Sequence, residues 1–215
     1  MKKYLFILSV SVNILSVTLL LGLGYMYHDK IIDRLSPQRQ ADILLIGDSR
    51  IAQENWQNLL GRTDIRNCAA GGLTTQQILW GIERGNLNCS PEICILEGGI
   101  NDLLMGIPVE RICNNFQAII SLLEKNKVIP ILQTVIYTTD DPEVNLQVTE
   151  VNNCLKKLSL QRNICLLDIN SFLSDGQRLN PKLSTDGIHL KAEAYEIWSG
   201  HLNLRIDSLL RKEYK

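Results

Sequence analysis

The chain has 215 residues and a formal net charge of -1. Apolar residues make up 45% of it and charged residues 21%, the balance of an ordinary globular protein. Because the net charge is near zero and no basic stripe occurs along the chain, a nucleic-acid partner is not expected.

The first 27 residues differ from the rest of the chain. After Met1-Lys2-Lys3, residues 4–27 contain no charge and are mostly apolar. About 20 such residues span a bilayer as a helix, so we expect a signal anchor over residues 1–27. The positive-inside rule then keeps the N-terminus cytoplasmic and places the remaining chain outside, in the periplasm or extracellular space. A cleaved signal peptide is the alternative, although no Ala-x-Ala-like site follows the apolar run.

Residues 28–41 are expected to be a polar linker, and residues 42–215 a single domain. Apolar runs typical of buried strands alternate with helical stretches through this domain. The predicted strands are Ile43–Gly47, Asp64–Cys68, Ile93–Glu97, Val128–Val135 and Ile164–Asp168, and the predicted helices are Ile51–Leu60, Thr75–Arg84, Pro108–Lys125, Glu143–Leu160 and Lys191–Arg211. Nearly continuous apolar strands separated by helices indicate a sheet covered on both faces. We therefore predict an α/β fold, a three-layer α/β/α sandwich with a mostly parallel sheet of about five strands.

The cysteines leave two interpretations open. They are Cys68, Cys89, Cys94, Cys113, Cys154 and Cys165. An exported domain could pair them as disulfides, but the sequence does not indicate which would pair. Cys94 and Cys165 fall inside predicted strands, where a free cysteine packs as a small apolar residue. No Cys-x-x-Cys or Cys/His cluster suggests a metal site, and neither a metal nor a cofactor is expected.

Four polar segments follow predicted strands or precede the last helix. They are Gly47-Asp48-Ser49, Asn67–Thr74 with Gly71-Gly72, Gly98–Asp102, and Thr185–Leu190 with Asp186 and His189. The carboxyl ends of parallel strands are where open α/β sheets place their ligand sites. Each segment alone is ordinary turn or helix-cap chemistry, with Asp48 bonding neighbouring backbone. Their joint occurrence on this predicted fold indicates a functional site.

Together and in this order, the segments resemble the SGNH (GDSL-type) hydrolase superfamily, from about Asp42 to Tyr195. The resemblance implies a flavodoxin-like sandwich and a serine esterase. It implies that Ser49 is the nucleophile, His189 the general base and then acid, and Asp186 the group that fixes the His189 tautomer. The implied oxyanion donors are the backbone N–H groups of Ser49 and Gly72 and the side-chain amide of Asn101. Gly71 is the alternative to Gly72, which fits the spacing from Asn67 better.

Two further features bear on the substrate. Relatives often have leucine after the serine, whereas this chain has Arg50, which we expect to contact an anionic or hydroxyl-rich substrate or to form a surface salt bridge. Trp56, Trp80 and Trp198 could form a sugar-stacking surface, although their helical positions favour the core.

The resemblance and the expected location together predict a membrane-tethered serine esterase. Its substrate would be a small-molecule or glycan ester, such as an O-acetyl or other short acyl group on carbohydrate, cleaved through an acyl-enzyme intermediate. Two alternatives remain: an O-acyltransferase with the same triad, and a non-catalytic tethered binding module.

Overall fold

The computed structural model describes residues 12–13, 16–18, 22 and 41–213. The chain divides into two units, Met1–Arg39 and Gln40–Lys215. In the described ranges, no helix has both the length and the apolar character needed to cross a membrane. Most of the signal anchor expected over residues 1–27 and nearly all of the expected linker lie outside the described residues, so both stay predictions.

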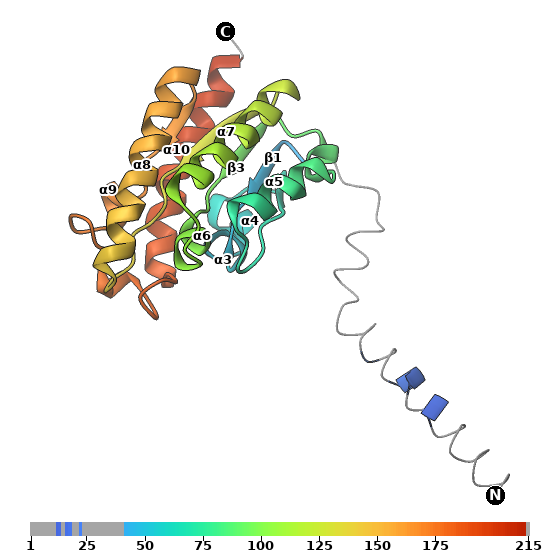
Figure 1. Cartoon of the computed structure of the whole chain (residues 1–215). Helices are drawn as coiled ribbons and strands as arrows, with labels where there is room; N and C mark the ends of the chain where they lie inside the picture. Colours follow the sequence, from blue (N-terminus) through green and yellow to red (C-terminus); the bar gives the residue numbers. More distant parts are fainter. Residues whose placement is uncertain (1–11, 14–15, 19–21, 23–40, 214–215) are drawn as a thin grey trace, which may run out of the picture. The chain divides into compact units, whose positions relative to one another are not determined.

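A five-stranded parallel sheet forms the centre of the domain (Figure 1). Its strands are β1 (Ile43–Ile46), β2 (Ile65–Asn67), β3 (Ile93–Leu96), β4 (Ile129–Gln133) and β5 (Cys165–Leu167). Their order is β2-β1-β3-β4-β5, so the chain moves to one side of β1 to form β2 and returns to the other side for β3. Open sheets of this kind bind ligands at the carboxyl ends of the strands beside such a reversal. The predicted parallel α/β fold is confirmed.

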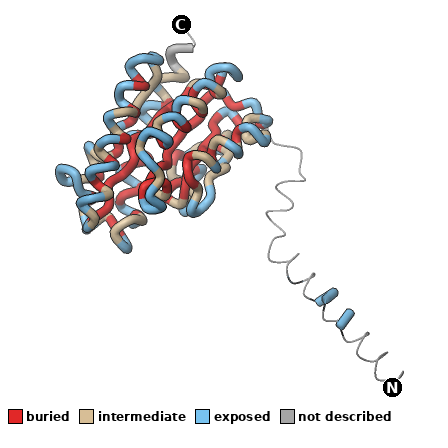
Figure 2. The backbone as a smooth tube through the Cα atoms, viewed as in Figure 1, coloured by how far each residue is buried: buried red, intermediate tan, exposed pale blue. Residues whose placement is uncertain are grey.

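Helices cover both faces of the sheet. As a consequence, β1 and β3 are buried throughout (Figure 2). One layer holds α5, α7 and α8, and the other holds α4, α9 and α10 (Figure 1). The helices are α3 (Ser49–Ala52), α4 (Trp56–Leu60), α5 (Thr75–Glu83), α6 (Ile100–Leu104), α7 (Val109–Lys125), α8 (Pro142–Arg162), α9 (Asn170–Leu173) and α10 (Ala192–Glu213), with 3-10 turns η1 (Asn86–Cys89) and η2 (Pro181–Leu183).

The helix predictions were wrong at short elements. The single helix expected over Ile51–Leu60 is two helices, α3 and α4. The interruption follows from Asn55, whose side chain accepts a hydrogen bond from the backbone N–H of Asn58 and so begins a new helix. The sequence analysis also missed α6 and α9, which are five and four residues long and too short to show a helical period.

An aromatic cluster connects the two ends of the domain sequence. Trp56 and Trp198 are buried with their ring centroids 5.0 Å apart in an edge-to-face contact, and Tyr195 packs against both rings. Trp80, by contrast, is 46% exposed. The three tryptophans therefore do not form a common sugar-stacking surface, and the core interpretation is confirmed for Trp56 and Trp198.

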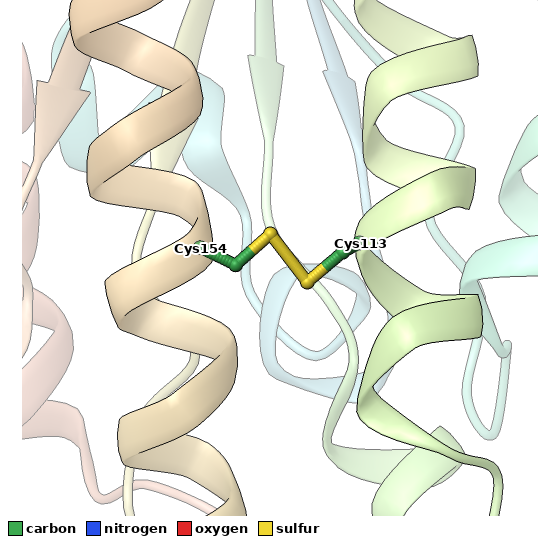
Figure 3. The surroundings of a disulfide bond; sticks show 2 residues. All are labelled: Cys113 and Cys154. Carbon is green, nitrogen blue, oxygen red and sulfur yellow. A yellow bond between two sulfur atoms is a disulfide. The ribbon is translucent and has the colours of Figure 1, made fainter.

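Cys113 on α7 and Cys154 on α8 form a disulfide, with their Cα atoms 6.4 Å apart (Figure 3). Cys68, Cys89 and Cys94 are free thiols; Cys89 and Cys94 are buried, and Cys68 and Cys165 are half-buried. Both interpretations of the cysteines thus apply, each to different residues. The bond ties together the two longest helices of one layer.

Removing this disulfide is expected to destabilise the domain without altering its site. The cross-link spans 41 residues of sequence, for which loop-closure entropy in the unfolded chain corresponds to about 4 kcal/mol. A Cys113→Ser/Cys154→Ser variant should lower the free energy of unfolding in urea by an amount of this order. Dithiothreitol should lower wild-type stability to the same level and leave the variant unchanged. A wild-type chain whose urea midpoint ignores dithiothreitol would contradict the prediction.

Candidate active site

The four polar segments meet at the carboxyl edge of the sheet. Ser49 lies after the Gly47-Asp48 turn that follows β1, and it is the first residue of α3. Asp48 caps that helix by accepting a hydrogen bond from the backbone N–H of Arg50 at 3.0 Å. The expected backbone role of Asp48 is confirmed. Gly47 is needed at this turn because a Cβ there would lie 2.8 Å from the carbonyl oxygen of Glu97, at the end of β3. The close approach of this turn to the end of β3 therefore requires glycine at position 47.

Ser49, His189 and Asp186 form a continuous hydrogen-bonded chain. The Ser49 Oγ lies 3.0 Å from His189 Nε2, and His189 Nδ1 lies 2.7 Å from Asp186 Oδ2. The other Asp186 oxygen accepts from the backbone N–H groups of His189 at 2.7 Å and Ile188 at 3.0 Å. Hydrogen bonds from the His189 ring, and then from the His189 backbone, hold the pKa of Asp186 well below its usual range. The carboxylate is therefore charged and correctly placed to orient the imidazole.

Asp186 and His189 share one short segment, Ser184–Leu190, which we call the Asp–His loop. Its ends are joined by hydrogen bonds to the His189 carbonyl from the Thr185 backbone N–H at 3.0 Å and the Ser184 hydroxyl at 2.9 Å. Gly187 has a φ of +95°, and a Cβ there would lie 2.8 Å from Thr139 Oγ1. The loop therefore requires glycine where it packs against the segment after β4.

Apart from the Ser49 N–H, the expected oxyanion donors lie on the segments after β2 and β3. Asn101, near the start of α6, donates one amide hydrogen to the Leu73 carbonyl at 3.0 Å, which leaves its second amide hydrogen for a substrate oxygen. Gly71 is close to the nucleophile, because a Cβ on it would lie 3.9 Å from the Ser49 Cβ. Gly72 is exposed with a φ of +76°. The choice between these two glycines stays a prediction.

Asp102 is a residue whose part in the site the sequence analysis missed. It is buried, and it accepts hydrogen bonds from the Thr75 backbone N–H at 2.8 Å and the Thr75 hydroxyl at 2.6 Å. The Asn115 amide donates in turn to the Thr75 hydroxyl at 2.9 Å. Burial raises the pKa of Asp102, and the Thr75 bonds oppose that rise. These contacts join the start of α5 to α6, and so hold the Gly72 segment beside Asn101.

Arg50 does not lie where the sequence analysis expected. Its side chain is buried, with 0% of the residue exposed, and its guanidinium donates to backbone carbonyls of Ile188, Ile136 and Tyr137. Both expected roles, a substrate contact and a surface salt bridge, are therefore wrong. An arginine can occupy the interior here because backbone carbonyls supply the hydrogen bonds that its charge loses with water.

The hydrogen-bonded chain opens to solvent beside a small pocket of about 240 Å³. Of the hydrogen-bonded residues, His189 has a side chain that is 30% exposed, and Asp186 has one that is 53% exposed. The pocket is lined by the segment after β4, the Asp–His loop and α6, and it combines apolar with polar side chains: Leu104, Thr138, Thr139, Asp140, Asp141, Asp186, Gly187 and Ile188. Asp186 is the member of the Ser49–His189–Asp186 chain that a ligand in this pocket would contact.

A parallel α/β sheet with a Ser–His–Asp chain at its carboxyl edge has the geometry of a serine hydrolase of the SGNH type. The chain belongs to the GDSL-like lipase/acylhydrolase family, whose model matches residues 45–197. The family's description is that of lipases and acylhydrolases. This membership supports an enzyme over the alternative of a non-catalytic binding module.

Three similar proteins illustrate the relationship. N-acylneuraminate cytidylyltransferase of Streptococcus agalactiae serotype V is 32% identical over 172 residues, which are 80% of this chain and 40% of that protein. Platelet-activating factor acetylhydrolase IB subunit alpha2 of Gallus gallus is 26% identical over 167 residues, with 73% of this chain and 72% of that one covered. The crystal structure of a GDSL-like lipase from Bacteroides thetaiotaomicron has the same fold, with a TM-score of 0.75, 17% identity, and 86% and 97% of the two chains covered. This chain thus spans about 40% of the length of the Streptococcus relative.

Proposed function

We propose that Ser49, His189 and Asp186 cleave a carboxylic ester through an acyl-enzyme intermediate. The Ser49 Oγ attacks the ester carbonyl while His189 Nε2 takes its proton. The tetrahedral intermediate then expels the alcohol, which receives that proton from His189. Water, activated by the same nitrogen, releases the acid and restores Ser49. The single observation that supports these roles is the continuous chain of hydrogen bonds from Ser49 through His189 to Asp186.

The oxyanion of the tetrahedral intermediate is proposed to accept hydrogen bonds from the backbone N–H groups of Ser49 and Gly72 and from the Asn101 amide. The Asn101 bond to the Leu73 carbonyl supports this role, because it orients the amide before substrate arrives. A donor that needs no reorientation during the reaction stabilises developing charge most effectively.

An Asn101→Ala variant is expected to lose about 10²- to 10³-fold in kcat, the usual effect of removing one oxyanion donor. KM should change little, because the missing bond is made mainly to the oxyanion. Steady-state hydrolysis of p-nitrophenyl acetate measures both constants. Asn114→Ala, an exposed change on α7, is the matched control and should match wild type. Wild-type kcat in Asn101→Ala would remove the residue from the proposed site.

The proposed substrate is a short acyl group, such as O-acetyl, esterified to a carbohydrate hydroxyl. The pocket beside the Asp–His loop supports this choice, because the threonine hydroxyls and aspartate carboxylates among its lining residues can bond a hydroxyl-rich group, and its volume of about 240 Å³ suits a small ligand. One relative adds support by its name, which is that of an acetylhydrolase.

A series of p-nitrophenyl esters from acetyl to dodecanoyl, followed by O-acetylated monosaccharides, tests the substrate class. We expect kcat/KM to be highest for acetyl and to fall as the acyl chain lengthens, and we expect acetate release from the sugars. A preference for dodecanoyl would contradict the proposal. The same assay with a free sugar acceptor measures acyl transfer: product that appears on the acceptor in place of free acetate would favour the O-acyltransferase alternative.

We further propose that the domain is tethered to a membrane by residues 1–27 and lies outside the cytoplasm. The uncharged run over residues 4–27, preceded by Lys2 and Lys3, supports this proposal. The Cys113–Cys154 disulfide is also typical of an oxidising compartment. The test is a reporter that works only in the cytoplasm, fused after Lys215. Activity of this reporter would contradict the proposed orientation.

A further inference from the structure

Arg50 is a buried charge next to the proposed nucleophile. Its Nε donates to the Ile188 carbonyl at 3.0 Å, and its two terminal nitrogens donate to the carbonyls of Ile136 at 2.8 Å and Tyr137 at 3.4 Å. Burying a guanidinium costs free energy unless each of its donors is bonded. A hydrophobic side chain would fill this space without that cost. The hydrogen-bond partners of Arg50 are therefore the feature that a buried arginine provides and an apolar residue would not.

The partners of Arg50 belong to different parts of the sheet edge. Ile188 lies in the Asp–His loop, between Asp186 and His189, whereas Ile136 and Tyr137 lie in the segment after β4. Within the described residues, Arg50 is the only side chain that bonds the Ile188 carbonyl. A planar guanidinium with five N–H donors can hold separate carbonyls at once, whereas the lysine ammonium acts as a point charge. The arginine thus connects α3, which contains Ser49, to the loop that contains His189.

Two buried carboxyl groups, those of Asp48 and Glu97, interact electrostatically with Arg50. Asp48 and Glu97 are both fully buried and interact with each other and with Arg50. Among the described residues, no hydrogen-bond donor reaches Asp48 Oδ2 or either carboxyl oxygen of Glu97. Burial, followed by the charge of Asp48, raises the pKa of Glu97 well above its usual range. Burial also raises the pKa of Asp48, and the charge of Arg50 opposes the rise at both carboxyl groups.

We propose that Arg50 is a positioning residue, which holds the Asp–His loop at hydrogen-bonding distance from Ser49 and takes the Asp48–Glu97 pair as its buried counter-charge. The proposal rests on the proposed roles of Ser49 and His189 and extends them. It explains why the residue after the serine is a long cation, although no substrate can reach it. A displacement of the loop by about 1 Å would lengthen the Ser49–His189 bond and can reduce turnover about 10²-fold.

The main test compares kcat and KM for p-nitrophenyl acetate in the wild-type chain, Arg50→Lys and Arg162→Lys. Lysine keeps the charge but cannot bond the Ile188 and Ile136 carbonyls with one planar group. We expect Arg50→Lys to fold, to lose about 10- to 100-fold in kcat and to keep the wild-type KM. The rate at which a fluorophosphonate labels Ser49 should fall by the same factor. Arg162→Lys, a change in a surface pair with Glu124, is the matched control and should equal wild type.

Several results would overturn the proposal. A folded Arg50→Lys chain with wild-type kcat is one, and a raised KM with unchanged kcat is another, because it would assign Arg50 to substrate binding. If Arg50→Lys does not fold, Asp48→Asn/Arg50→Met removes the charge and its counter-charge together, a change that folded proteins often tolerate. This double variant should fold and be slow. Wild-type kcat in it, or failure of both variants to fold, would overturn the positioning role.

A different result distinguishes this proposal from the proposed function. A wild-type chain that is neither active on the ester nor labelled at Ser49 would refute the proposed catalytic roles, and the Arg50 proposal with them. Wild-type activity and labelling that persist unchanged in Arg50→Lys would refute the Arg50 proposal alone.

Discussion

A Ser49→Ala variant is expected to lose about 10⁶-fold in kcat for ester hydrolysis, the effect of removing the nucleophile from a triad. Alanine removes the only atom that can form the acyl-enzyme, the Oγ that lies 3.0 Å from His189 Nε2. The fold should be unaffected, because Asp48 still caps α3 through the backbone of residue 50. Residual hydrolysis would come from the oxyanion donors and from substrate binding.

Two measurements check this result. Fluorophosphonate should modify the wild-type chain at Ser49 and leave Ser49→Ala unlabelled, and p-nitrophenyl acetate hydrolysis gives the ratio of turnover rates. Ser121→Ala, an exposed serine on α7, is the matched control and should keep both labelling and activity. Equal labelling of Ser49→Ala and wild type would show that another residue is the nucleophile.

The second large effect is expected from Asp186→Asn, which should lower kcat about 10⁴-fold, as when the aspartate of a triad is replaced by asparagine. The reason lies in the two sets of contacts that Asp186 makes. One oxygen accepts from the backbone N–H groups of Ile188 and His189, so the asparagine carbonyl is expected on that side. Its amide NH₂ then faces His189 Nδ1, which must accept a hydrogen bond. The ring proton moves to Nε2, where it blocks proton transfer from Ser49.

The shape of the Asp–His loop should survive this substitution, because the bonds from the backbone to position 186 remain. Steady-state kinetics and the near-UV circular dichroism spectrum together separate loss of catalysis from loss of fold. The exposed Asp175 provides the control, since Asp175→Asn changes the same functional group outside the Ser49–His189–Asp186 chain of hydrogen bonds. If Asp186→Asn kept wild-type turnover, a different group would have to orient His189.

Strands and long helices were predictable because burial imposes a pattern on them. Ile43–Ile46 and Ile93–Leu96 are buried on both faces, so every position is apolar and the run is visible in the sequence. All five strand predictions were too long. After β4, for example, the Thr134 backbone N–H still donates to the Leu167 carbonyl of β5, but the Val135 N–H donates to the Asn152 side chain, which ends the strand pairing. Short apolar stretches do not distinguish a strand from the bonded segment that follows it.

The candidate site was predictable where its residues are close in sequence. Asp186 and His189 are three positions apart, and Ser49 lies in the turn after a strand. These residues could therefore be predicted as site residues from the sequence. Arg50 and Asp102 could not be placed in this way. The carbonyl partners of Arg50 lie 86 to 138 positions away, and Thr75 lies 27 positions from Asp102. Arginine is also almost always exposed, which made a surface role the natural prediction.

The order of the site's residues along the chain has a consequence for protein synthesis. The nucleophile and the expected oxyanion donors lie between Ser49 and Asn101, whereas the base lies at His189, just before α10. A ribosome-bound chain that ends before residue 189 therefore contains the reactive hydroxyl but nothing to take its proton. Such a nascent polypeptide could not form an acyl-enzyme, so esterase activity arises only after the last segment of the site has been translated.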